Sequence, residues 1–327
     1  MALRLPLRVA FEHGRGTGPR SRMTRRGLLL FASMCVIWGI PYLLIRVAVR
    51  DLSPAALVFA RTSIAALLLL PIAAARGEVR PVLRRWWPLL IFTAVEIAVP
   101  WLLLSSAETR LSSSLTGLLI AAVPLVGALT VRTTGDRERL GVRSTAGLLV
   151  GLVGAAALVG LDLGGASAVG VAEVAAVVVG YAVGPIILAR YLAGLPALGV
   201  IAVSLAVTAV VYLPIAAFSI PAHLSLAAGA SVAGLAAICT ALAFILFFAL
   251  IGEIGPVRAT VITYVNPAIA ALLGVTILGE SFTVGMGVGF VLVLAGSILA
   301  TRPRAEVPAR RPELRGEALA ATSASNR

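Results

Sequence analysis

Ten long apolar stretches divide the sequence, and they constrain the fold more than any other feature. A bilayer core about 30 Å thick requires about 20 consecutive apolar residues in a helix that crosses it. The stretches run approximately from Gly27 to Val49, Pro54 to Ala75, Trp86 to Ala107, Ser112 to Val131, Gly141 to Gly160, Val171 to Ala189, Ala197 to Ile220, Ser231 to Ile251, Val257 to Leu278 and Phe282 to Thr301. The sequence therefore predicts an all-α polytopic membrane protein with ten transmembrane helices.

The composition excludes a soluble domain and several enzyme classes. The chain of 327 residues is 60% apolar and 13% charged, with a mean hydropathy of +1.03, whereas soluble domains are about 45 to 50% apolar and about 25% charged. All 27 basic residues are arginine, which excludes chemistry that needs a lysine, such as a P-loop or a Schiff base. Cys35 and Cys239 lie in separate apolar stretches, so we expect no disulfide framework, no metal site and no cofactor.

The distribution of arginine predicts the orientation in the membrane. If the N-terminus is cytoplasmic, 23 of the 27 arginines fall on the cytoplasmic side, including those in a basic tail 1–26 and a disordered tail 302–327. This bias follows the positive-inside rule and predicts that both termini are cytoplasmic, whether translation starts at Met1 or Met23. The formal net charge of +13 then reflects topology and attraction to anionic lipid, so we expect the lipid bilayer as a partner and no nucleic acid.

The sequence nearly repeats itself after about 143 residues. The segment Leu70–Ala74 recurs as Leu213–Ala217. Further pairs follow in the same order at offsets of 142 to 144 residues: Pro41 with Pro185, Pro54 with Pro196, Pro124 with Pro267, Glu138 with Glu280, Gly147 with Gly289 and Gly154 with Gly296. We predict two domains of five spans each, residues 27–160 and 171–301. Because five is odd, the second copy must enter the membrane from the opposite side, and such inverted repeats are typical of secondary transporters.

Some of these residues also form a pattern found in a known family. They are Trp38-Gly39, Arg61, Pro124, Pro267, Leu278-Gly279-Glu280 and the glycine-rich stretches 141–160 and 282–301. In this pattern the chain resembles the EamA-type branch of the drug/metabolite transporter superfamily over nearly all of residues 27–301. The resemblance implies a central cavity lined by the first four spans of each repeat, a peripheral fifth span, and movement of small metabolites, often outward. Pro41-Tyr42 departs from the family pattern.

Glu96 is the leading candidate for substrate binding or proton coupling. It lies about ten residues into the stretch Trp86–Ala107, close to the bilayer midplane, where an ionised side chain costs at least about 2.5 to 3.5 kcal/mol. Pro100 has no N–H to bond the Glu96 carbonyl, so we expect a kink beside the carboxylate. Two interpretations follow: Glu96 faces a cavity and binds a substrate amine or a proton, or it forms a fixed ion pair with Arg61.

Four further residues complete the predicted site. Arg61 can bind a substrate carboxylate through two hydrogen bonds, or it can pair helices or snorkel to the surface. Trp38 can stack on a substrate or pack against other side chains. Tyr264 and Asn266 can line the cavity or bond their own backbone. Four prolines are predicted to act as hinges: Pro41, Pro100, Pro124 and Pro267.

These features predict a secondary transporter of the cytoplasmic membrane, an exporter of small metabolites such as amino acids or amines that works by alternating access. The alternatives are a passive facilitator or channel of the same fold and, less favoured, an intramembrane enzyme. Against an enzyme, the two histidines, His13 and His223, lie outside the apolar stretches and form no catalytic cluster with the few aspartates. Gly147-xxx-Gly151 and Gly285-xxx-Gly289 predict close helix packing, either within the bundle or in a homodimer.

Overall fold

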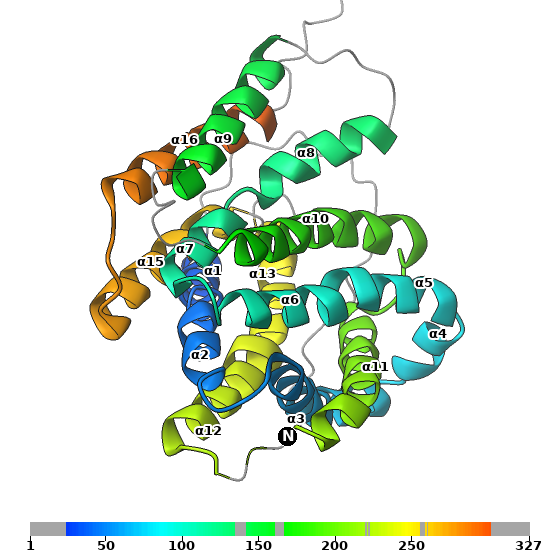
Figure 1. Cartoon of the computed structure of the whole chain (residues 1–327). Coiled ribbons are helices and arrows are strands. Elements are labelled where there is room, and N and C mark those ends of the chain that lie inside the picture. Colours follow the sequence, from blue (N-terminus) through cyan, green and yellow to red (C-terminus); the bar gives the residue numbers. More distant parts are fainter. Residues whose placement is uncertain are drawn as a thin grey trace, which may run out of the picture.

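The computed structural model of this chain describes residues 24–134, 142–160, 167–219, 221, 223–255, 259 and 261–301, and every regular element among them is helical (Figure 1). The first repeat contains α1 (Arg25–Ile37), α2 (Pro41–Ala48), α3 (Pro54–Ala75), α4 (Val79–Leu83), α5 (Trp86–Phe92), the π-helical η1 (Thr93–Ala98), α6 (Val99–Ala107), α7 (Ser113–Ile120), α8 (Val123–Thr134) and α9 (Val142–Gly160). The second contains α10 (Ala168–Tyr191), α11 (Ala197–Ala217), α12 (Leu226–Ala233), the π-helical η2 (Gly234–Leu242), α13 (Ala243–Ile254), α15 (Ile262–Leu278) and α16 (Val284–Thr301).

The helices agree with the predicted apolar stretches in place and, for most of them, in length. Among the described residues, seven helical segments are long and apolar enough to cross a membrane: Arg25–Ala48, Pro54–Ala75, Trp86–Ala107, Ser113–Thr130, Ala168–Tyr191, Ala197–Ala217 and Leu226–Ile254. Three apolar helices are shorter: Thr145–Ala157, Ile262–Leu278 and Val284–Leu299. The predicted all-helical, multi-pass membrane protein is confirmed, whereas the count of ten crossings stays a prediction. Residues 1–23 and 302–327 of the two predicted tails lie outside the described residues.

The helices expose apolar side chains and bury polar ones. Leu67 is 75% exposed and Val210 is 69% exposed. Thr62 and Thr208 are fully buried, and each hydroxyl donates at 2.8 Å to the backbone carbonyl four residues earlier. A soluble protein would have the opposite arrangement, because water solvates polar groups better than apolar ones. The outer surface is therefore suited to lipid.

The last helix of each repeat lies at the edge of the bundle. Helices α9 and α16 pack side by side along their lengths (Figure 1). A Cβ atom added to Gly154 would lie 2.6 Å from the backbone nitrogen of Val293, and one added to Gly296 would lie 2.6 Å from the carbonyl oxygen of Gly147. Glycine is required at both positions because the two backbones approach so closely. The predicted glycine faces are thus occupied within the chain, and homodimerisation stays a prediction.

The prolines predicted to be hinges occupy different helical contexts. Pro41 is the first residue of α2, directly after the turn that separates α1 from α2. Pro124 is the second residue of α8, after a similar break between α7 and α8. A proline at the start of a helix is favoured because its missing N–H is not needed there. Pro100 follows η1, and Pro267 lies inside the continuous helix α15. Hinge motion at these positions stays a prediction.

The two π-helical segments occupy the same place in the two repeats. The first residues of η1 and η2, Thr93 and Gly234, are 141 residues apart, and their last residues, Ala98 and Leu242, are 144 residues apart. A π-helical turn is a rare conformation that often marks a functional site, because it widens the helix and redirects side chains. In the first repeat the widened turn contains Glu96 and ends two residues before Pro100, so the disturbance expected beside the carboxylate takes the form of a π-helical turn.

Candidate functional site

The centre of the candidate site is the buried guanidinium of Arg61. This side chain lies in the first half of α3 and is 7% exposed. Its guanidinium carbon is 3.7 Å from the centroid of the Trp101 ring on α6, and its Nε donates a hydrogen bond of 2.9 Å to the hydroxyl of Thr240 on η2. A cation over an aromatic face is stabilised by the negative electrostatic potential of the ring. Arg61 therefore links three helices of the two repeats.

The π-helical conformation of η2 supports this arrangement. The Thr240 hydroxyl donates at 2.7 Å to the carbonyl of Leu235, five residues earlier. The same hydroxyl oxygen accepts the hydrogen bond from Arg61, so it acts as donor and acceptor at once. Cys239, the preceding residue, is also buried and interacts electrostatically with the guanidinium. The wider turn thus supplies an oriented, neutral partner to the cation.

Arg61 has no anionic partner in the described part of the chain. No carboxylate lies within ion-pair distance of its guanidinium, and its two terminal nitrogens donate to none of the described groups. The other electrostatic neighbours are the phenol groups of Tyr42 and Tyr181. A buried cation is costly without an opposite charge. This guanidinium is therefore suited to accept an anion from outside the protein.

Glu96 and Arg61 share Tyr181 as an electrostatic neighbour but do not pair with each other. The Oε2 atom of Glu96 is buried and has no hydrogen-bond partner. Tyr181 on α10 interacts electrostatically with both Glu96 and Arg61, which places the phenol in the same region as the acid and the base. The fixed ion pair between Glu96 and Arg61, one of the two interpretations of the sequence, is absent from the structure. Arg61 and Glu96 are thus connected through Tyr181 and form no direct ion pair.

Helix α10 approaches Glu96 through two glycines. A Cβ atom added to Gly184 would overlap the Glu96 carboxylate, and one added to Gly180 would lie 2.6 Å from the carbonyl oxygen of Val95. The ring of Pro100 also lies 2.9 Å from that added Cβ at Gly180. Because α10 approaches so closely, its backbone covers much of the Glu96 carboxylate, although no side chain donates a hydrogen bond to Oε2.

The equivalent contact in the other half of the bundle is neutral. Ser204 on α11 is the repeat counterpart of Arg61, 143 residues later in the sequence. Its hydroxyl accepts a hydrogen bond of 2.9 Å from the hydroxyl of Thr93 on η1. Both contacts therefore join a membrane-spanning helix of one repeat to the π-helical segment of the other. The charge resides in one half only, so the polar region is asymmetric although the fold is repeated.

The other predicted site residues lie at the contact of α1 with α13 and α15. The Trp38 ring packs against Phe244 and Phe247, with centroid distances of 6.0 Å and 4.7 Å. The Asn266 amide, oriented with its nitrogen toward the backbone, donates to the carbonyls of Cys35 at 3.1 Å and Ile262 at 2.9 Å. Tyr264 is half-buried near the start of α15. These positions agree with packing and backbone-bonding roles, and substrate binding by the three residues stays a prediction.

Sequence reasoning did not place three neighbours in the site: Trp101 and Thr240, which contact Arg61, and Tyr181, which interacts with both Arg61 and Glu96. Trp101 lies five residues after Glu96 in the same predicted span, and this proximity in sequence could have indicated that Trp101 belongs to the site. Thr240 lies in the repeat counterpart of the segment around Glu96. Tyr181 precedes Gly184-Pro185 on α10, but its relation to Arg61 depends on tertiary packing. Of the five predicted binding residues, Arg61 and Glu96 are the two that share Tyr181 as a neighbour, and their role in binding stays a prediction.

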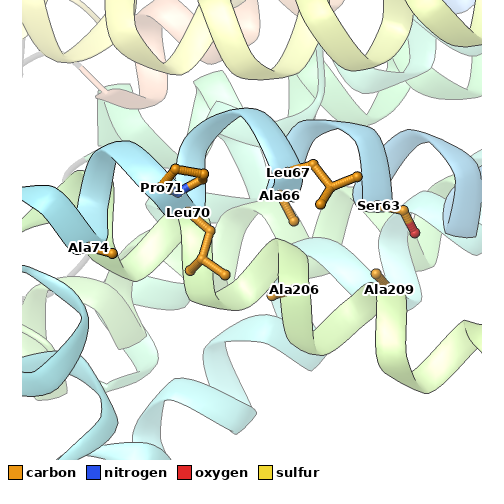
Figure 2. A pocket seen from close by; sticks show the side chains of 8 residues that line it. All are labelled: Ser63, Ala66, Leu67, Leu70, Pro71, Ala74, Ala206 and Ala209. Carbon is orange, nitrogen blue, oxygen red and sulfur yellow. The ribbon is translucent and has the colours of Figure 1, made fainter.

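A separate apolar groove lies between α3 and α11 (Figure 2). Its volume is about 490 Å³, and its lining residues are Ser63, Ala66, Leu67, Leu70, Pro71, Ala74, Ala206 and Ala209. Figure 2 shows Leu67, Leu70 and Pro71 along one side and Ala206 and Ala209 along the other. Because Leu67 is strongly exposed, this groove opens on the lipid-facing surface and contains neither Arg61 nor Glu96.

Comparisons with known proteins agree with the two-repeat organisation. The sequence profile described as the EamA-like transporter family matches residues 25–160 and again residues 168–302. A solved structure described only as "Crystal structure of protein" has the same fold, with a TM-score of 0.61 at 23% sequence identity, over 84% of this chain and 96% of the other. No curated protein matches the chain.

Proposed function

Because this chain belongs to the EamA-like transporter family, we propose that it is a secondary transporter that exports a small zwitterionic metabolite, such as an amino acid, by alternating access. The observation that carries the proposal is the buried Arg61 guanidinium, which lacks a carboxylate partner among the described residues and shares the neighbour Tyr181 with Glu96, whose Oε2 has no hydrogen-bond partner. A ligand with one negative and one positive group can satisfy both.

In this proposal Arg61 binds the substrate carboxylate. Trp101 and Thr240 hold the guanidinium plane and its Nε, which leaves the two terminal nitrogens free to form parallel hydrogen bonds with two carboxylate oxygens. Such bidentate bonds are both stronger and more directional than a single charged contact. Glu96 binds the ammonium group, and Tyr181 lies near both charges. Binding gives the buried cation an opposite charge and gives the unpartnered Oε2 of Glu96 a hydrogen-bond donor.

The transport cycle is proposed to use the repeated architecture. We expect the chain to cross the cytoplasmic membrane ten times in two inverted halves, with a polar site between the halves. Both termini should then lie in the cytoplasm. Cysteine labelling tests the inversion: the single replacements Glu138→Cys and Ser281→Cys should react with an impermeant thiol reagent from opposite faces. Reaction of both from the same face would contradict an inverted repeat.

Transport by purified protein in lipid vesicles tests the function. The panel consists of an amino acid, the amine that lacks its carboxylate and the carboxylic acid that lacks its amine, each with and without a pH gradient. We expect accumulation of the amino acid against its concentration gradient and weak transport of the two fragments. Arg61→Gln should abolish transport of the amino acid. A facilitator of the same fold would equilibrate the substrate without accumulating it, and no flux of any compound would overturn the proposal.

A further inference from the structure

Two carboxylates that make no ion pair with Arg61 lie at one end of the bundle and interact electrostatically, and one of them, Glu108, shares the neighbour Tyr42 with Arg61. Glu280 follows α15, and Glu108 follows α6, five residues before the start of α7. Each Glu280 oxygen accepts two hydrogen bonds. Oε1 accepts from the backbone N–H and hydroxyl of Ser113, at 2.8 and 3.0 Å, and Oε2 accepts from those of Ser114, at 2.8 and 2.6 Å. Glu280 thus fastens the end of α15 to the first turn of α7.

The four hydrogen bonds favour the charged form of Glu280. The first N–H groups of a helix have no partner within the helix, and a carboxylate there also gains from the helix dipole. Burial acts in the opposite direction and raises the pKa of Glu280, but the hydrogen bonds from Ser113 and Ser114 more than offset this, and the net pKa lies below its ordinary value. Glu280 is therefore the ionised member of the pair.

Glu108 is in the opposite situation. It is 0% exposed, and neither of its carboxylate oxygens has a hydrogen-bond partner. The Arg46 guanidinium on α2 donates to the backbone carbonyl of Glu108. Burial, followed by the negative charge of Glu280, raises the pKa of Glu108 well above its ordinary value, and Arg46 opposes this only in part. Two carboxylates in one site rarely carry two charges, so Glu108 retains a proton.

The other charged and titratable groups around Glu108 do not neutralise it. Helix α2 contributes Arg46 and the phenol of Tyr42, which is buried and interacts with Glu108. On α10, Glu173 forms an ion pair of 3.1 Å with Arg110 and accepts a hydrogen bond from Ser106. Glu173, Arg110 and Ser106 are engaged with one another, so the protonation state of Glu108 depends on its burial first and then on Glu280 and Arg46.

Glu280 lies within a close contact between α15 and α7. A Cβ atom added to Gly274 on α15 would overlap Oε2 of Glu280 and Oγ of Ser114, so α15 and α7 are in close contact beside the carboxylate. The backbone N–H of Glu280 donates to the Gly274 carbonyl at 3.1 Å, and the Ser114 hydroxyl contacts the Ala271 carbonyl at 3.4 Å. The carboxylate, the end of α15 and the start of α7 therefore form one unit.

We propose that Glu108 is a proton-binding site that keeps this end of the bundle closed. With a proton on Glu108, the charged Glu280 remains on the first turn of α7. When that proton leaves to water, two negative carboxylates face each other, Glu280 withdraws from Ser113 and Ser114, and α15 separates from α7. The inference rests on the proposed transport function, for which it names the proton as the coupling ion and Glu108 as its site.

Thiol labelling of the substrate-free protein tests this closure. Ala271→Cys places a thiol on α15 where the side chain is 6% exposed, and a water-soluble maleimide reports opening. The double replacement Ala271→Cys with Glu108→Gln is the reference, because it shows how the reaction of the thiol with the maleimide depends on pH when Glu108 cannot release a proton. Relative to that variant, we expect the labelling rate to rise with pH by up to about tenfold per pH unit, the limit for release of one proton. Glu280→Gln should give fast labelling at every pH.

The matched control is Glu173→Gln, which removes an acid at the same end that is already paired with Arg110. It should leave the pH dependence of labelling unchanged. Identical pH profiles with and without Glu108→Gln would overturn the proposal, as would loss of the pH dependence in Glu173→Gln. Infrared spectroscopy in a Glu96→Gln background needs no replacement of Glu108. It should show a protonated-carboxyl band that disappears as pH rises, and absence of that band would also overturn the proposal.

Failure of this inference is distinguishable from failure of the proposed function. Labelling and infrared measurements require no substrate, whereas the vesicle assay requires no knowledge of Glu108. Proton-dependent labelling without transport of any compound would contradict the proposed function and support the proton site. If the protein accumulates an amino acid but its labelling rate does not depend on pH, the proposed function is supported and the assignment of Glu108 as the proton site is wrong.

Discussion

The Arg61 guanidinium carbon lies 3.7 Å from the centroid of the Trp101 ring, so a cation in one membrane-spanning helix rests on an aromatic face in another. Arg61 belongs to α3 and Trp101 to α6, both in the first repeat, while the hydrogen-bond acceptor Thr240 belongs to the second. The orientation of the guanidinium thus depends on both halves of the bundle. Any relative movement of the two halves would change the contacts of Arg61 with Trp101 and Thr240. The geometry of the candidate site therefore depends on the relative position of the two repeats.

Replacement of the aromatic face should weaken substrate binding. A cation–π contact contributes about 0.5 to 2 kcal/mol, which corresponds to about a twofold to thirtyfold change in affinity. We expect Trp101→Leu to raise the KM for the transported amino acid within this range and Trp101→Phe to have a smaller effect. Trp87→Leu is the control, because Trp87 is 61% exposed and packs only against Trp86 among aromatic residues of the described chain. Equal effects of the replacements at 101 and 87 would argue against the contact.

The hydroxyl of Thr240 should contribute to stability as well as to orientation. Thr240→Val keeps the shape of the side chain but removes the acceptor for Arg61 Nε, and a hydrogen bond to a charged group is worth about 1.5 to 3 kcal/mol. We expect a lower unfolding temperature in detergent and partial recovery with Thr240→Ser. Thr276→Val is a suitable control, because the exposed Thr276 hydroxyl bonds only the Leu272 carbonyl of its own helix at 2.6 Å. A loss at 276 as large as that at 240 would contradict this assignment.

Helix positions were predictable from the sequence because lipid imposes both length and apolarity on a spanning segment. Close packing of α9 and of α16 against some other helix was predictable for a similar reason, since their glycines leave one helix face without side chains, but the sequence did not show that the two helices pack on each other. The placement of Glu96 beside a disturbed helical turn followed from Pro100, which lacks an N–H. Each of these expectations depends on local chemistry that the sequence states directly.

The contacts within the site were not predictable in the same way. A helix that is apolar on all sides gives no periodic signal for the face it turns toward its neighbours. The sequence therefore left open whether Arg61 meets Glu96 or Trp101. Glu108 follows the apolar part of its span and reads as a group at the membrane surface. Its burial depends on cover from α2 and from the residues after α15, which are distant in the sequence.

Asp51 should make a pH-dependent contribution to stability outside the spans. It joins the turn after α2 to the start of α12, where the Ser225 backbone N–H donates to it at 2.9 Å. Hydrogen bonds from the side chain and backbone of Ser225 lower the pKa of Asp51. Because the folded pKa lies below the unfolded value of about 3.9, the stabilisation is complete above that value and is lost as pH falls through the folded pKa.

The measurement for Asp51 is the unfolding temperature of Asp51→Asn against the unmodified protein over a range of pH. The difference should be constant at neutral pH and disappear in acid below about pH 4, the ordinary range of an aspartate. Arg50→Gln should retain most of this difference, because Arg50 makes the smallest contribution to the lowered pKa of Asp51. A difference that persists unchanged in acid would mean that the carboxylate charge is not responsible.

The contact between Gly184 and Glu96 should be visible as a coupling between two replacements. A methyl group at Gly184 would overlap the Glu96 carboxylate, and overpacking of a tight interface costs about 1 to 3 kcal/mol. Gly184→Ala should therefore lower the yield of folded protein and its unfolding temperature. Glu96→Ala removes the side chain that the methyl group meets, so the double replacement should recover much of the loss. Gly252→Ala should be tolerated, because nothing lies within 4 Å of a Cβ added there. Additive effects of the two replacements would show that Gly184 is required for some reason other than the position of the Glu96 carboxylate.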